Sequence, residues 1–68
     1  MREFTLTSDY IELVKLLKLL RIAQTGGHAK ILVEDGEVIR NGETEYRKRA
    51  KLIKGDVIEV MDQKITIV

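Results

Sequence analysis

The stretch from Thr25 to Gly42 constrains the fold of this chain more than any other part of its sequence. It opens with a threonine whose hydroxyl can accept an N–H group of a first helical turn. Gly36 then offers the left-handed residue at which helices commonly end. Asn41-Gly42 is the strongest short signal for a two-residue β-hairpin loop. The stretch therefore predicts a short helix over about Gly26–Asp35, followed at once by an antiparallel hairpin.

The residues before this stretch predict one strand and one longer helix. Arg2–Leu6 alternates between apolar and polar side chains, as a half-buried strand does. We expect the helix to run from about Asp9 to Ile22, with an N-cap within Thr7–Asp9 and Glu12 in a loose capping-box position. Its apolar face is typical of a core-facing helix and comprises Tyr10, Leu13, Leu16, Leu17 and Leu20, widened by Val14 and Leu19.

After Gly36 the apolar period changes from 3.6 to 2, which indicates strands. The hairpin should pair residues 37–40 with 43–46, placing Arg40 opposite Glu43. The pattern leaves open which face of this hairpin points inward. A basic loop follows over Arg47–Lys54, with Leu52 and Ile53 as its expected apolar anchors.

Two further strands complete the pattern. A turn at Gly55-Asp56 precedes a strand over Val57–Met61, and a turn at Asp62-Gln63 precedes a strand over Lys64–Val68. The pattern leaves open whether this last strand closes the sheet or pairs with another molecule. The 68 residues allow a single domain over 1–68. We therefore predict an α+β fold, with two helices packed on a small, largely antiparallel sheet of four to five strands.

Basic residues are concentrated in one segment. The net charge of the chain is only +1, yet residues 40–54 hold six of its 12 basic residues and two acidic ones, a local charge of +4. Such an asymmetry points to an anionic partner. Four cations, Arg47, Lys48, Arg49 and Lys51, fall within five positions, and both arginines could bind a phosphate with two hydrogen bonds. The alternative is a merely solvated loop.

Two glycines open the second helix, although each costs about 1 kcal/mol in a helix interior. Thr25, Gly26 and Gly27 could leave N–H groups uncovered for a phosphate, with Lys30 one turn further on. The alternative is a helix cap that also permits close helix packing. His28 has no recognisable catalytic partner, and we interpret it as an ordinary helix residue.

These motifs, in this order and spacing, resemble the RNA-binding domain first described in ribosomal protein S4, the αL motif, and above all its stand-alone bacterial YaaA/YbcJ group. The resemblance covers roughly residues 4–60. The matching segments are Leu19–Ala23, Thr25–Lys30, Gly36–Val38, Asn41–Glu43, Arg47–Leu52 and Gly55–Val57. His28 stands where that group usually has Glu, and Arg40 where a second Val is common. Arg40 should then either add a surface cation or pair with Glu43.

The resemblance implies an RNA surface built from the second helix, its preceding loop and the basic hairpin region. Carried to this chain, it implicates Thr25, Gly26, Gly27, Lys30, Asn41, Arg47, Lys48, Arg49 and Lys51. It also implies that the RNA is structured, ribosomal or tRNA-like. Only three aromatic residues, Phe4, Tyr10 and Tyr46, are present, which argues against reading a single-stranded sequence by stacking.

We therefore predict a non-catalytic RNA-binding module that needs neither metal nor cofactor. The absence of cysteine excludes disulfides, and no segment predicts a secretory signal or a membrane span, so we expect a cytoplasmic protein. We expect a monomer, with a protein partner in an RNA-processing or ribosome-associated complex as a further expectation. The alternative function is a protein-interaction or accessory module that docks on an acidic partner or a separate enzyme chain.

Overall fold

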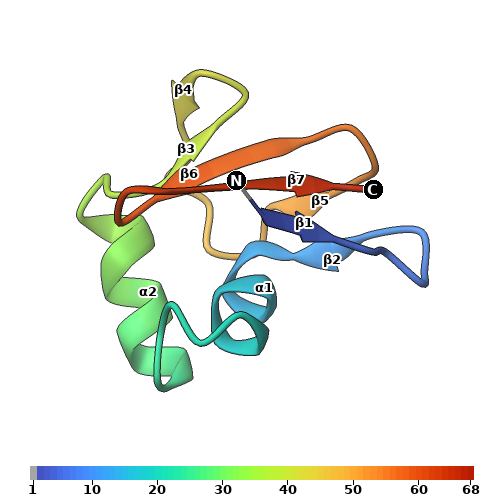
Figure 1. Cartoon of the computed structure of the whole chain (residues 1–68). Coiled ribbons are helices and arrows are strands. Elements are labelled where there is room, and N and C mark those ends of the chain that lie inside the picture. The colour runs from blue at the N-terminus through green and yellow to red at the C-terminus, as the bar shows by residue number, and fades with distance from the viewer. Residues whose placement is uncertain (1) are drawn as a thin grey trace.

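Five strands form the main sheet, in the spatial order β1-β7-β6-β3-β4. A computed structural model describes residues 2–68 of the chain (Figure 1). β1 is parallel to β7, and the other neighbours are antiparallel. The remaining two strands, β2 and β5, form a separate antiparallel pair. The elements are β1 (Arg2–Phe4), β2 (Ile11–Glu12), α1 (Leu13–Leu19), α2 (Gly26–Glu34), β3 (Ile39–Arg40), β4 (Glu43–Thr44), β5 (Lys51–Leu52), β6 (Val57–Val60) and β7 (Gln63–Ile67).

Both helices lie on one side of the main sheet, where they pack on each other (Figure 1). Leu13, Leu16 and Leu17 of α1 are fully buried, as are Ala29 and Val33 of α2. They meet the inward residues of β6 and β7, among them Ile58, Ile65 and Ile67. The predicted α+β class and helix-on-sheet architecture are therefore confirmed. Neither described helix is long enough to cross a bilayer.

The first helix is shorter than predicted. It begins at Leu13, and its N-cap, Glu12, makes no side-chain capping bond, so the predicted cap within Thr7–Asp9 was wrong. The cause lies in β5, since Ile11 and Glu12 pair with Leu52 and Lys51 and are thereby held in an extended conformation. The amide of Leu13 also donates to the carbonyl of Ala50. A contact with a distant segment has overridden local helix propensity.

Three apolar residues predicted to face the core are exposed instead, two from the helix stripe and one from the basic loop. Tyr10 precedes β2 and lies outside the helix, and Leu19 is the last residue of α1 on its solvent side. Ile53 follows Leu52 in the chain, and because side chains alternate along an extended segment, only Leu52 points into the core.

The hairpin has the predicted register, with Ile39 opposite Thr44 and Arg40 opposite Glu43. Asn41 and Gly42 both have positive φ, of 51° and 86°, as a two-residue loop of type I′ requires. The strands are shorter than predicted, although the amide of Glu45 still donates to the carbonyl of Val38. Val38 is fully buried, so its face is the inward one.

The last strand pairs within the chain. β7 lies between β1 and β6, so it is an interior strand, and the edges of the sheet are β1 and β4. The turn that precedes it comprises Met61 and Asp62, one residue earlier than predicted, because Val60 pairs directly with Gln63. This pairing keeps Val60 and Ile65 on the buried face.

Leu52 and Ile53 allow a direct test of this arrangement, because they are neighbours in sequence but are 0% and 51% exposed. Leu52→Ala should lower the free energy of unfolding by about 2–5 kcal/mol, since it leaves a cavity in the hydrophobic core. Ile53→Ala should change it by less than about 0.5 kcal/mol. Urea unfolding followed by circular dichroism measures both. Equal losses in the two variants would contradict the burial described here.

Candidate nucleic-acid interface

The N-terminus of α2 is capped as the sequence predicts. The hydroxyl of Thr25 accepts a hydrogen bond from the amide of His28 at 3.0 Å. The imidazole of His28 in turn accepts one from the amide of Gln24, with an N–N distance of 3.3 Å. Glu or Gln at this third helical position commonly makes a similar return bond in a capping box. His28 thus has a structural role that local spacing alone did not reveal.

Gly26 and Gly27 leave this helix end open. A Cβ atom at Gly26 would come no closer than 3.9 Å to its nearest neighbour, the Cδ atom of Lys18, so close helix packing does not require this glycine. Within residues 2–68, neither amide donates a hydrogen bond to a protein acceptor. Two N–H groups therefore stay available at the positive end of the helix dipole.

A groove of about 620 Å³ lies beside this helix end. Its walls come from α1, from α2 and from the loop between β4 and β5, with Gly26 among the lining residues. Five of its lining residues are basic, and they converge from segments far apart in sequence. These residues are Lys15, Lys18, Lys30, Lys48 and Arg49, which we call the basic groove.

The basic groove has a strong excess of positive charge. Lys48 pairs with Glu34, with an Nζ–Oε2 distance of 3.0 Å, and both side chains are solvent-exposed. In the described part of the chain the other four cations form no ion pair. Glu12 is the single acidic residue in the lining. Four unpaired cations beside two uncovered amides can accommodate an anion such as a phosphate.

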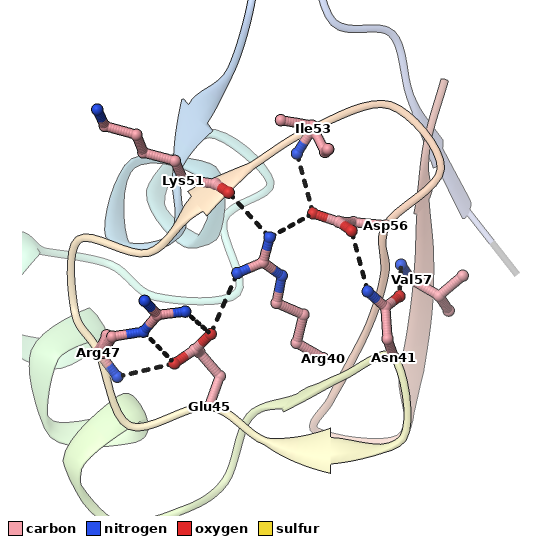
Figure 2. Close-up of polar contacts among 8 residues, drawn as sticks. All are labelled: Arg40, Asn41, Glu45, Arg47, Lys51, Ile53, Asp56 and Val57. Atoms are coloured by element: carbon pink, nitrogen blue, oxygen red, sulfur yellow. Dashed lines mark hydrogen bonds and ion pairs between the residues drawn. The ribbon is translucent and has the colours of Figure 1, made fainter.

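A polar network beside the groove fixes the basic loop (Figure 2). The guanidinium of Arg40 bonds to Asp56 at 2.8 Å, to Glu45 at 3.2 Å and to the carbonyl of Lys51 at 2.9 Å. Glu45 also accepts two bonds from the guanidinium of Arg47. The Arg40, Glu45 and Asp56 side chains are only 19%, 11% and 9% exposed. The alternatives foreseen for Arg40, a surface cation or a pair with Glu43, were therefore wrong.

The network also shifts the acidity of its carboxyl groups. Hydrogen bonds from the side chain of Arg47, with further bonds from its amide and from Arg40, outweigh burial and lower the pKa of Glu45 to about 2. Burial raises the pKa of Asp56, but hydrogen bonds from the Ile53 amide, Asn41 and Arg40 together bring it below its usual value. Both groups therefore stay ionised well below neutral pH.

Asn41 connects the hairpin loop to the start of β6 (Figure 2). Its side-chain amide donates to Asp56 at 2.9 Å, and its carbonyl oxygen accepts from the amide of Val57 at 2.8 Å. Because Asn tolerates a positive φ better than most residues, it serves the turn and the network together. Both ends of its side chain thus have partners within the protein.

Comparison with known proteins identifies the family of this chain. The family model described as the S4 domain matches residues 4–68. The chain belongs to the S4 domain family. YbcJ of Escherichia coli is 34% identical over 59 residues, which cover 87% of this chain and 84% of YbcJ. The protein of Bacillus subtilis named "Probable ribosome maturation protein RlbA" is 38% identical over 56 residues, 82% of this chain and 79% of that one.

A solved structure is similar to this S4 domain over its whole length. The solution structure of YbcJ from Escherichia coli superposes with a TM-score of 0.75 at 33% identity. The match covers 100% of this chain and 87% of YbcJ, which is described as having an αL motif involved in RNA binding. The resemblance seen in the sequence motifs is thereby confirmed.

Some of the predicted contact residues lie at the basic groove, and the others lie outside it. Gly26, Lys30, Lys48 and Arg49 line the basic groove, with Thr25 and Gly27 next to Gly26. Asn41 and Arg47 lie in the polar network, and Lys51 lies on β5. Lys15 and Lys18 of α1 also line the groove, although they are not among the contact residues predicted from the sequence. Their spacing of three residues, which places them on one face of a helix, was the available signal.

The shifted carboxyl groups predict a pH dependence of stability. Because the pKa of Glu45 falls from 4.5 to about 2 on folding, its contribution is present above about pH 4.5 and is lost as the pH falls towards 2. Glu45→Gln should lower the free energy of unfolding at pH 7 by about 2–3 kcal/mol and flatten its decline between pH 5 and 2. Urea titrations across this range measure both effects. The exposed Glu43, changed to Gln, is the control, and an equally steep decline in Glu45→Gln would contradict the network.

Proposed function

We propose that this S4 domain binds structured RNA through the basic groove and acts without catalysis. The observation that carries the proposal is the convergence of four unpaired cations, Lys15, Lys18, Lys30 and Arg49, beside the uncovered amides of Gly26 and Gly27. Cations held on a rigid surface position phosphates, while the groove geometry selects among RNA shapes. Such a site requires neither a metal nor a cofactor.

Ribosomal RNA or a tRNA-like RNA is the class of target that we propose. Two observations support it: the name of the Bacillus relative refers to ribosome maturation, and the structure of YbcJ is described in terms of RNA binding. A cytoplasmic protein that works as a monomer, with an RNA-processing or ribosome-associated complex as its setting, fits this target. Described residues hold no cluster of three or more metal-ligating side chains, and we propose no cofactor.

We propose two kinds of contact within the predicted residue set. Thr25, Gly26, Gly27, Lys30, Lys48 and Arg49 contact phosphates at the groove, together with Lys15 and Lys18. Arg47 and Lys51 extend the positive surface along the loop, since the Arg47 side chain is 74% exposed even while Glu45 holds it. A contact from Asn41 stays a prediction, because its side chain already binds Asp56 and Val57.

Salt dependence tests the electrostatic part of this proposal. If the four unpaired cations each neutralise one phosphate, log K should fall with log salt at a slope of about −3.6 for a duplex-like RNA. Affinity for a ribosomal RNA fragment should then drop roughly a hundredfold between 50 and 200 mM salt. Fluorescence anisotropy measures both. Binding that is insensitive to salt would contradict the phosphate mechanism and favour the alternative, a protein-interaction module that docks on an acidic partner.

Charge variants locate the site. The triple variant Lys18→Gln, Lys30→Gln and Arg49→Gln should lower affinity and make the slope shallower by about 2.7, since three phosphate contacts are removed. The matched control changes three cations outside the groove lining, Arg2, Lys54 and Lys64, and should retain most of the slope. Circular dichroism verifies that both variants fold. Equal slopes in the two triple variants would remove the groove from the proposal.

A further inference from the structure

A second concavity, of about 410 Å³, adjoins the basic groove and has a different chemistry. It lies where the loop after β1 meets α1, and most of its lining is apolar. We call it the apolar pocket and define it by Phe4, Leu6, Tyr10, Ile11 and Leu19. A pocket with an apolar lining and a few polar groups at its rim is typical of a small-ligand or side-group site.

The rim of the apolar pocket is open to solvent. Leu6 and Ile11 are each 7% exposed and form its floor, whereas Tyr10 and Leu19 are 42% and 56% exposed. Neither of these two belongs to the core, so their exposure has no explanation in the packing of the domain. Adjoining exposed apolar side chains around a concavity mark an interaction site more often than isolated ones do.

Two observations connect the apolar pocket with an RNA ligand. Glu12 and Lys15 line both the pocket and the basic groove, so the two concavities adjoin each other. The ammonium group of Lys51 lies 4.9 Å from the centre of the Tyr10 ring, in a cation–π contact. Cations therefore flank the pocket at Lys15 and at Lys51, as expected where a ligand carries negative charge beside an apolar group.

We propose that the apolar pocket receives one unpaired nucleobase of the RNA whose phosphates occupy the basic groove. A nucleotide combines a flat apolar base with an anionic phosphate. The apolar pocket and the basic groove, which share Lys15 in their linings, match these two parts. The inference rests on the proposed function and adds the class of RNA to it: a helical RNA with a bulged, looped-out or terminal unpaired nucleotide.

The surroundings of Tyr10 are suited to stacking. The hydroxyl of Ser8 donates to the carbonyl of Tyr10 at 2.8 Å and so fixes the backbone that carries the ring. Thr7 and Glu12 in the lining supply polar atoms for the edge of a base. The apolar pocket has room for one base, and the rest of the RNA is recognised by its phosphates at the basic groove.

The test compares hairpin RNAs that carry one bulged nucleotide, each of the four bases in turn, with the same hairpin fully paired. Stacking of one base on an aromatic side chain should favour at least one bulged RNA about 5- to 150-fold. Tyr10→Ala should bring the ratio of the affinities for the bulged and the paired hairpin to about one, whereas Tyr10→Phe should keep the preference. Tyr46→Ala is the matched control, since Tyr46 is 64% exposed and outside the pocket.

The possible results separate this inference from the proposed function. Binding of the paired hairpin without preference for any bulged RNA, or a preference that survives Tyr10→Ala, overturns the pocket assignment and leaves the proposed function intact. A lack of binding to every RNA at low salt overturns both. NMR signals of Tyr10 and Leu19 should shift only with bulged RNA. Signals that stay fixed during RNA binding would overturn the inference.

Discussion

Arg40 bridges Glu45 and Asp56, and this bridge fixes the basic loop, on which the shape of the basic groove depends. A guanidinium can satisfy two carboxylates and a carbonyl at once because its donors are fixed in a plane. Here those acceptors lie before, within and after the basic loop, at Glu45, Lys51 and Asp56. One side chain therefore fixes a loop that has little regular structure of its own.

The basic groove gains its shape from this restraint. Arg40 and Arg47 together balance the charges of Glu45 and Asp56, so the network adds no net charge to the surface. The positive field comes instead from Lys15, Lys18, Lys30 and Arg49, which have no acidic partner in the described chain. Apart from Arg47, the charges that hold the loop and the charges that face a ligand are different residues, so changes in the groove cations need not disturb the network.

Much of the fold could be predicted from short-range signals. Thr25, Gly36 and Asn41-Gly42 set the local backbone conformation, and all three had the predicted conformations. The start of α1 could not be predicted, because it depends on pairing between residues 11–12 and 51–52. For the same reason, only some of the cations of the basic groove could be predicted. Its loop cations form a run in the sequence, whereas Lys15 and Lys18 join them only after the chain has folded.

The parallel pairing of β1 with β7 has a consequence for how this protein acquires its structure. Residues 2–4 pair with residues 65–67. The strand pairing with the longest separation along the chain therefore also adds the edge strand of the sheet. Closing so long a loop costs entropy before any contact repays it, which slows folding relative to helical domains of similar size. During synthesis the sheet stays incomplete until β7 has left the ribosome, because β1 has its strand partner in β7. β1 is therefore made long before it can join the sheet.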